Sequence, residues 1–376
     1  MQTAKYQRLI MPEFILKQAS KYPNISNLAK HSCTKMFTNF EIDYYGDVRI
    51  CCKTWMPEPV GNLLEQSASE IINSQKIKGM LFDMRQGGFG YCNDLCPTLN
   101  DFLHDKSQFY IVPKTEVDNQ IKGQSIVVNF SYDPSCNLQC PSCRSELLMV
   151  DPINPTDPRE LHILQVHEKV KLLVDELLST GRIITLSITG SGDPFAGNIF
   201  WNYLKDLSSK TVPANLRIQL VTNGTLMTEK RLLEIKSLWP HITNASVSID
   251  AATEETYKVV RKNGSFNNLK KNLIHFDSLI MSGAFPRWQG WQTNFIVQRD
   301  NFREMKEFVE WQLTYLSRPV IWLHLIAQWY HIPDEKFKVM AIHLDGHDFK
   351  NDLVEIIKDP VFSNTQVRMG NLNSIT

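Results

Sequence analysis

The chain lacks a net charge and lacks long hydrophobic runs. Forty basic residues balance forty acidic ones among 376 residues, which argues against a broad surface for nucleic acid or an anionic membrane. No stretch approaches the roughly 20 apolar residues of a membrane span. The charged N-terminus, residues 1–18, has no apolar run long enough for a signal peptide. We therefore expect a cytoplasmic protein with neither a nucleic-acid nor a membrane partner.

Cysteine is also lacking, from every position after Cys143. The eight cysteines all fall in the first part of the chain, at positions 33, 51, 52, 92, 96, 136, 140 and 143. In a reducing compartment, clustered cysteines are more often metal ligands than disulfides. The two sets, about 40 residues apart, are therefore candidates for metal binding.

The second set has the spacing C-x3-C-x2-C and consists of Cys136, Cys140 and Cys143, the loop cysteines. Three thiolates from one loop can hold three irons of a 4Fe-4S cluster and leave the fourth iron open, because such clusters are normally held by four cysteines. The alternative is a zinc site completed by a distant His or Asp. Zinc sites usually pair C-x2-C units, so the x3 spacing favours iron and sulfur.

A strand and a helix flank this loop. Residues 125–132, a β-branched and aromatic run, predict a buried strand before it. After it, Asp157 and Pro158 predict the start of a helix, whose leucine periodicity ends at Gly181. The cysteine loop therefore follows a strand and leads into a helix.

The same alternation repeats along the rest of the chain. Further strands, each followed by helical residues, are predicted at 182–189, 216–222, 245–250, 291–297 and 320–327. Six β/α units imply parallel strands joined by right-handed crossovers. The predicted fold class is α/β: a partial (β/α)6 TIM-like barrel with a small N-terminal cysteine-rich α+β domain. Active sites of such folds lie at the carboxyl ends of the strands.

Four residues around the loop cysteines complete a recognisable motif: Asn137, Pro141, Ser142 and Arg144. With them the loop resembles the cluster loop of radical S-adenosylmethionine (radical SAM) enzymes, in which many members have an aromatic residue at the position of Ser142. The resemblance is strongest to the branch with an extra cysteine domain called SPASM, or its shorter form, twitch. It implies a 4Fe-4S cluster, S-adenosyl-L-methionine, and an electron donor such as flavodoxin or ferredoxin.

Later motifs follow the order of this family, each after a predicted strand. The cofactor-binding residues implied by the resemblance are Gly190, Ser191, Gly192, Asp193, Asn223, Ser248, Asp250 and Arg261. Asp193 would accept from the cofactor's ammonium group, and Arg261 would pair with its carboxylate. The alternatives are an ordinary Asp-Pro turn after Gly192 and a solvated helix charge at Arg261.

The first ninety-six residues resemble the SPASM or twitch domain. Cys33, Gly46 and Cys51 fit its C-x(9–15)-G-x4-C signature, and the alternating run around Gly46 predicts a hairpin that brings the two cysteines together. The implied ligands of an auxiliary iron–sulfur cluster, called the auxiliary cysteines, are Cys33, Cys51, Cys92 and Cys96. Cys52 is left over, either as a core residue or with a ligand or redox role. The alternative is that the auxiliary cysteines bind a structural zinc ion.

The resemblance divides the chain at residue 110. Residues 1–110 would form the SPASM/twitch-like auxiliary domain, and residues 111–376 the radical SAM partial barrel with a C-terminal helical tail. Twitch is the better name for the first, because no cysteines remain for a second auxiliary cluster. Near the sixth strand, Trp322 is predicted in the core, whereas residues 329–331 would either line the substrate mouth or pack.

The implied activity is that of a radical SAM enzyme. Reductive cleavage of S-adenosylmethionine would give a deoxyadenosyl radical, which abstracts hydrogen from a peptide or a small molecule such as a sugar, nucleotide or amino acid. Two other classes stay open. One is an iron–sulfur electron-transfer protein, and the other is a zinc-stabilised binding module; neither would carry out radical chemistry.

Overall fold

The computed structural model describes residues 22–93, 96–105, 109–328 and 332–375. The fold is mixed α/β, as predicted, with a large and mainly parallel sheet in the strand order β12-β11-β10-β9-β8-β7-β6-β2-β3-β4. Because this order has two ends, the described residues do not close a barrel. The TIM-like form of the sheet therefore stays a prediction. Residues 329–331, proposed above as a substrate mouth, lie outside the described ranges.

The chain forms two compact units. The first comprises residues 1–132, 156–187 and 213–217, and the second comprises residues 133–155, 188–212 and 218–376. The first unit thus includes residues beyond the predicted auxiliary domain of 1–110. The predicted boundary between sequence domains remains a prediction.

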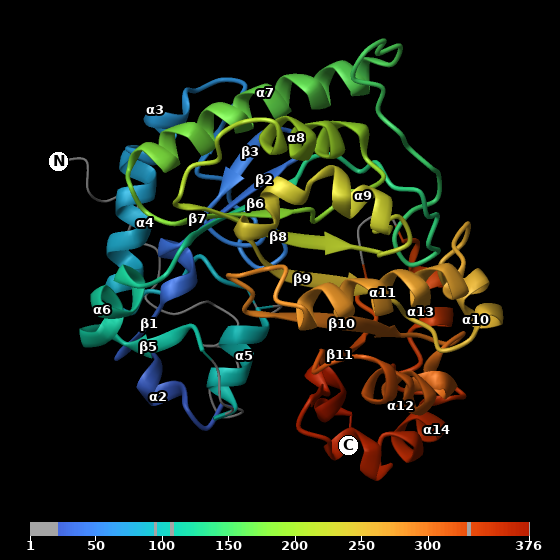
Figure 1. Ribbon diagram of the computed structural model, residues 1–376. Helices are drawn as coiled ribbons and strands as arrows, with labels where there is room; N and C mark the ends of the chain where they lie inside the picture. The colour runs from blue at the N-terminus through green and yellow to red at the C-terminus, as the bar shows by residue number, and fades with distance from the viewer. Residues whose placement is uncertain (1–21, 94–95, 106–108, 329–331, 376) are drawn as a thin grey trace. The chain divides into compact units, whose positions relative to one another are not determined.

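The first unit contains the cysteine-rich N-terminal segment and the strands that start the parallel sheet (Figure 1). Its elements are α2 (Ile25–Leu28), β1 (His31–Cys33), η3 (Thr34–Phe37), β2 (Asn39–Asp43), β3 (Asp47–Arg49), β4 (Gly61–Asn62), α3 (Ala68–Ile72), α4 (Gln75–Arg85), α5 (Pro97–Leu103), β5 (Ile111–Pro113), η4 (Lys114–Glu116), α6 (Val117–Lys122), β6 (Ile126–Ser131), α7 (Pro158–Ser179) and β7 (Ile184–Ile188), which ends in the second unit.

The predicted hairpin is present as β2 and β3, which pair antiparallel. Gly46 makes the turn with φ +78°, a conformation that favours glycine. β2 also pairs in parallel with β6, with Ile42 opposite Phe130, and both of these side chains are buried. The cysteine-rich segment therefore contributes strands to the main sheet, which the sequence did not predict.

Helix α7 begins where the sequence predicts. Asp157 caps it by accepting the N–H of Arg159 at 2.8 Å, and Glu160 completes a capping box. Pro158 occupies the first helical turn, where its missing N–H costs nothing. The helix ends before Gly181, as predicted, whose φ of +74° stops the helical path.

The second unit contains the remaining β/α alternation. Its elements are α8 (Asn198–Ser208), β8 (Leu216–Thr222), which begins in the first unit, α9 (Glu229–Glu234), η5 (Lys236–His241), β9 (Ile242–Ser248), α10 (Glu254–Val260), α11 (Phe266–Met281), β10 (Gly290–Val297), η6 (Phe302–Glu304), α12 (Met305–Tyr315), β11 (Val320–Leu325), α13 (Asp334–Met340), α14 (Lys350–Ile356), η7 (Pro360–Ser363), β12 (Val367–Arg368) and η8 (Gly370–Ser374).

Strands β8 to β11 run side by side in parallel (Figure 1). β8, β10 and β11 alternate between a buried apolar face and a half-buried face, as Phe295 and Asn294 do on β10, whereas β9 is buried at most of its positions. Trp322 was predicted in the core but lies on the half-buried face, because the buried positions of β11 are Ile321 and Leu323.

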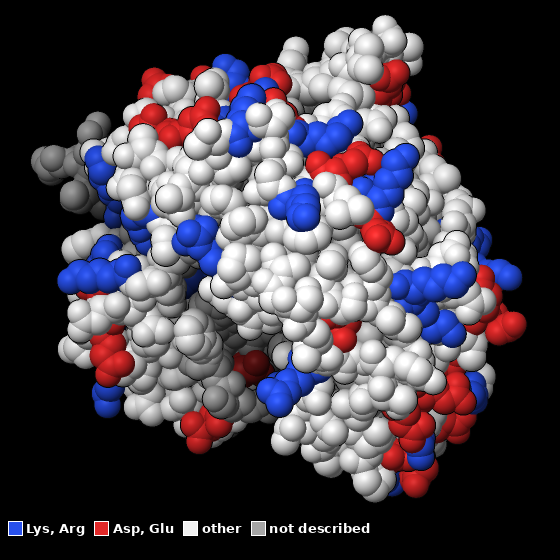
Figure 2. All heavy atoms as spheres, in the orientation of Figure 1, with Lys and Arg blue, Asp and Glu red and all other residues white. Residues whose placement is uncertain are grey.

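Basic and acidic side chains are interspersed on the face shown in Figure 2. Exposed ion pairs at 2.8 Å join Arg303 to Asp352 and Lys306 to Asp359 among the C-terminal helices of the second unit. None of the helices in the described ranges has the length and apolar character that crossing a bilayer requires.

Candidate metal centre

The loop cysteines follow β6 in a segment fixed by its own hydrogen bonds. The N–H of Ser135 donates to Asp133 Oδ1 at 2.9 Å, which turns the chain after the strand. The N–H of Cys143 donates to the carbonyl of Cys140 at 2.9 Å, and a tight turn thereby links these two cysteines. Cys136 and Cys140 are buried, whereas Cys143 is exposed.

Each loop sulfur lies beside an N–H donor from another side chain. The pairs, each separated by 3.6 Å, are Asn223 Nδ2 with Cys136 Sγ, Arg261 Nη1 with Cys140 Sγ, and Arg144 Nη2 with Cys143 Sγ. Such donors stabilise negative charge on sulfur, and they are one of the features by which proteins tune iron–sulfur clusters. The three sulfurs therefore lie in surroundings that suit thiolates.

Burial opposes ionisation of these thiols, and neighbouring cations favour it. Burial raises the pKa of Cys136 to about 11 and also raises the pKa of Cys140. Against burial, the charge of Arg261 lowers the pKa of Cys140, and the charge of Arg144 lowers that of Cys136. A bound metal would supply the remaining positive charge, because metal ligation requires deprotonated thiols.

The predicted turn after β7 packs against the cysteine loop. Ser191 Oγ donates to the carbonyl of Asp133 at 2.8 Å, and the carbonyl of Ser191 accepts Arg144 Nη2 at 2.8 Å. A Cβ on Gly192 would lie 2.3 Å from the carbonyl oxygen of Ser135, so only glycine fits there without a shift. This close approach explains why the turn needs a glycine at this position.

Asp193 is fully buried at the centre of this turn. Its Oδ2 accepts from Thr222 Oγ1 and from the N–H of Asn223, each at 2.7 Å, and its Oδ1 accepts the N–H of Phe195 at 2.9 Å. Burial raises the pKa of Asp193, while these hydrogen bonds lower it. Asp193 thereby fixes Asn223 beside Cys136.

Asp250 and Arg261 form a buried ion pair. Arg261 Nη2 lies 2.7 Å from Asp250 Oδ2, and Asp250 Oδ1 accepts the N–H of Ile296 at 2.8 Å. Burial raises the pKa of Asp250, whereas the charge of Arg261 lowers it. Asp250 has φ +65°, a conformation that short polar residues tolerate better than most.

Several buried polar atoms around the loop cysteines have no hydrogen-bond partner within the described part of the chain. They are Asp133 Oδ2, Arg144 Nε, Tyr257 Oη and Arg261 Nε. Unpaired buried polar groups are costly, so each invites an explanation. Two of the four belong to guanidinium groups beside thiols, a donor set that fits a negatively charged cluster and an anionic group of a cofactor.

The auxiliary cysteines lie together in the first unit. Burial raises the pKa of Cys33 to about 11, that of Cys51 to about 12, and that of Cys92 well above its ordinary value. Repulsion from the charges of the other auxiliary cysteines, including Cys96, adds to each rise. In the described ranges, no three His, Cys, Asp or Glu side chains converge on a single metal ion. In an iron–sulfur cluster each cysteine binds a different iron, so the four sulfurs do not have to surround a single metal ion.

Cys52 stands apart from this group although it follows Cys51 directly. After burial, the largest effect on the pKa of Cys52 comes from the charge of Glu41, followed by a hydrogen bond from Thr54. Glu41 itself is largely withdrawn from water, which raises its pKa. Cys52 therefore interacts with Glu41, and whether it has a ligand or redox role stays open.

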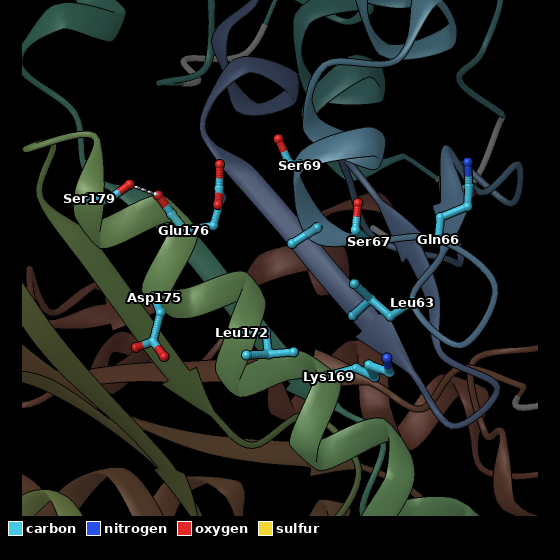
Figure 3. A pocket seen from close by; sticks show the side chains of 10 residues that line it. Leu63, Gln66, Ser67, Ser69, Lys169, Leu172, Asp175, Glu176 and Ser179 are labelled. Carbon is cyan, nitrogen blue, oxygen red and sulfur yellow. Dashed lines mark hydrogen bonds between the residues drawn. The ribbon is translucent and has the colours of Figure 1, made fainter.

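A separate hollow of about 420 Å³ lies between α3 and α7 in the first unit (Figure 3). Leu63 and Leu172 form part of its wall. Lys169, Asp175 and Glu176 also line it, and all three belong to α7. None of the predicted site residues lines this hollow. It offers no thiol or histidine for metal binding.

The structure thus brings Asn223, Asp250 and Arg261 to the cysteine loop, together with the turn that starts at the exposed Gly190. Ser248 ends β9 two residues before Asp250. The roles of these residues toward a cofactor remain predictions. Sequence reasoning gave no role to Arg144 or Tyr257. The position of Arg144 directly after Cys143 could have indicated a positive charge at that thiol. Nothing in the sequence distinguishes Tyr257 from an ordinary aromatic residue of the core.

Two segments of the chain match models of known protein families. Residues 131–283 match the radical SAM superfamily, and residues 33–97 match SPASM, an iron–sulfur cluster-binding domain. The chain is 27% identical, over 185 residues, to an AdoMet-dependent heme synthase of Methanosarcina barkeri (strain Fusaro / DSM 804). That match covers 49% of this chain and 46% of the relative, so the chain spans about half of that relative's length.

One solved structure, described as TYW1 with a lysine–pyruvate adduct bound, matches with a TM-score of 0.34 and 14% identity. The match covers 64% of this chain and 71% of that chain.

Proposed function

We propose that this chain is a radical SAM enzyme with a SPASM domain, which its matches to those two family models support. In this proposal the loop cysteines hold the 4Fe-4S cluster and the auxiliary cysteines hold the auxiliary iron–sulfur cluster. The radical SAM domain implies the first cluster and S-adenosylmethionine, and the SPASM domain implies the second cluster. The chemistry that these groups supply is reductive cleavage of S-adenosylmethionine and abstraction of hydrogen from a substrate by the deoxyadenosyl radical.

One observation carries the assignment of the loop. Each of its three sulfurs has its own N–H donor, from Asn223, Arg261 or Arg144. Three donors aimed at three sulfurs serve no purpose in a disulfide or a packed thiol. Together they stabilise the negative charge of a thiolate-bound cluster, and Asp193 keeps Asn223 in its position.

S-adenosylmethionine would bind along the strand ends next to the loop. We assign its contacts to Gly190, Ser191, Gly192, Asp193, Asn223, Ser248, Asp250 and Arg261. Asp193 is a buried carboxylate that Thr222, Asn223 and Phe195 hold in place at these strand ends. It would also accept from the ammonium group of the cofactor. The unpaired Nε of Arg261 is available to an anionic group in the same way.

The substrate would lie against the half-buried face of β9, β10 and β11. There, Asn294 Nδ2 and Gln292 Nε2 donate to Ser246 Oγ at 2.9 and 3.1 Å. Trp322 and His324 stack with their ring centroids 5.2 Å apart and an angle of 3° between the rings. Uncharged donors and a stacked ring pair favour an uncharged, hydrogen-bonding group on a small molecule or a peptide.

Iron content and cofactor cleavage test the proposal together. After anaerobic reconstitution, the chain should bind about eight irons, if both sites hold 4Fe-4S clusters. On reduction with dithionite it should convert S-adenosylmethionine to deoxyadenosine and methionine. Stoichiometric zinc, with no visible absorbance after anaerobic purification, would contradict the proposal and would favour a zinc-stabilised binding module.

A further inference from the structure

Lys35 is a cation held by aromatic rings next to an auxiliary cysteine. It follows Cys33 by two positions, in η3. Its Nζ lies 4.5 Å from the centroid of the Trp55 ring and 5.5 Å from that of the Tyr110 ring. Both distances fall within the range of cation–π attraction, which fixes the ammonium in position.

The two rings belong to segments that are tied to the auxiliary cysteines. The N–H of Trp55 donates to the carbonyl of Cys52 at 3.0 Å, and the carbonyl of Trp55 accepts the N–H of Asn93 at 3.0 Å. The carbonyl of Tyr110 accepts the N–H of Thr34 at 2.8 Å. These bonds fix the two rings relative to Cys33, Cys51 and Cys92, which directly precede Thr34, Cys52 and Asn93 in the sequence.

The turn that carries Lys35 begins at an auxiliary cysteine. Cys33 is the N-cap residue of η3, and Lys35 is the second residue of that helix. The ring of Trp55, over which the ammonium of Lys35 lies, belongs to the turn that starts at Cys52, directly after Cys51. Lys35 therefore brings a positive charge to the segments that carry Cys33 and Cys51.

We propose that Lys35 is a fixed positive charge that raises the reduction potential of the auxiliary cluster, and that Trp55 and Tyr110 hold it there. The inference rests on the proposed function, since it requires a cluster on the auxiliary cysteines. Reduction adds one electron, and therefore one negative charge, to the cluster. A nearby cation stabilises the more negative state, most strongly where water is excluded. The electron comes from the reductant that radical SAM chemistry already requires.

A redox titration of the full-length chain, followed by electron paramagnetic resonance, tests the proposal. In a background with the loop cysteines changed to Ala, only the auxiliary cluster gives a signal. Lys35→Met should move the midpoint to a more negative potential, and Lys35→Arg should restore it. Lys53→Met is the matched control. Lys53 also lies two positions from an auxiliary cysteine, but its Nζ pairs with Asp43 at 2.7 Å, so its removal should shift the midpoint less.

An unshifted midpoint in a Lys35→Met protein with a full auxiliary cluster would overturn the proposal. Should that variant lose the cluster, Trp55→Leu decides, because it keeps the lysine and removes the nearer ring. Its midpoint should be more negative than that of the background, and a midpoint equal to the background would again overturn the proposal. Absence of auxiliary iron from the background protein itself would contradict the ligand assignment instead, before any potential is measured.

Discussion

At the scale of single residues, Arg261 joins the ion pair with Asp250 to the sulfur of Cys140, through contacts of 2.7 and 3.6 Å. A guanidinium makes both contacts because its N–H groups form a planar fork, which an ammonium lacks. Arg261→Lys should keep the charge and lose one contact. A hydrogen bond to a charged group contributes about 1.5–3 kcal/mol. We therefore expect deoxyadenosine formation to slow by roughly tenfold or more.

The readout for Arg261→Lys is the rate of deoxyadenosine formation per loop cluster, with iron measured in the same sample. Arg303→Lys is the matched control, because Arg303 forms an exposed pair with Asp352 and exposed pairs contribute little. A wild-type rate in Arg261→Lys at full iron content would show that the fork is not needed.

A second prediction for a single residue concerns the substitution Gly192→Ala. A Cβ there would lie 2.3 Å from the carbonyl oxygen of Ser135, so the turn or the cysteine loop must move. Gly192→Ala should lower the free energy of unfolding by roughly 1–3 kcal/mol and should reduce the iron bound by the loop. In Gly123→Ala, by contrast, the new Cβ meets nothing within 4 Å, and both quantities should stay near the wild type. Equal behaviour of the two variants would contradict the close packing described here.

At the scale of elements, local pattern was enough to predict the six strands that became β6 to β11 and the capped start of α7 at Asp157. Those signals lie within a few residues of each other along the chain. The parallel pairing of β2 with β6 left no such signal, because its partners, such as Ile42 and Phe130, are far apart in sequence. Register of that kind is set by tertiary packing.

The candidate site was predictable to a similar extent. Cysteine spacing indicated the cluster loop, because one segment supplies all three thiols. Two of the three donors at those thiols, Asn223 and Arg261, come from other segments, and the hydrogen bonds from Thr222 and Asn223 to Asp193 join different strand ends. Only the folded chain shows that Arg261 meets Asp250 as well as Cys140.

The contact between α7 and the end of β6 should make the stability of the fold depend on pH. Tyr132 Oη lies 2.8 Å from His167 Nδ1, and both side chains are buried. Burial lowers the pKa of His167 to about 4, with smaller effects from Lys171 and Glu168. The ordinary value is about 6.5. The unfolded chain therefore binds more protons in this window, and stability should fall as the pH falls from about 6.5 toward 4.

Melting temperatures of the wild type and of His167→Gln, measured at pH 7.5 and pH 5.5, test this prediction. Gln keeps a polar partner for Tyr132 but does not titrate. The wild type should lose roughly 1 kcal/mol more stability than His167→Gln between these two pH values. The same loss in both proteins would mean that His167 is not the group that titrates.

At the scale of the whole molecule, the two proposed clusters belong to different compact units. The auxiliary cysteines fall in the first unit and the loop cysteines in the second. Separate units should tolerate the loss of one cluster independently, although metal-binding energy is partly folding energy. Changing the auxiliary cysteines to Ala should therefore lower iron by roughly half, and product formation should suffer more than cofactor cleavage. Circular dichroism of the same sample shows whether the first unit stays folded.

The central claim is that Cys136, Cys140 and Cys143 hold the cluster at which S-adenosylmethionine is cleaved. Its most direct test is deoxyadenosine formation by the reconstituted, dithionite-reduced chain in which all three are changed to Ala. This variant should keep roughly half of the wild-type iron, on the auxiliary cysteines, and should form no deoxyadenosine. Deoxyadenosine formation at the wild-type rate by that variant would contradict the claim.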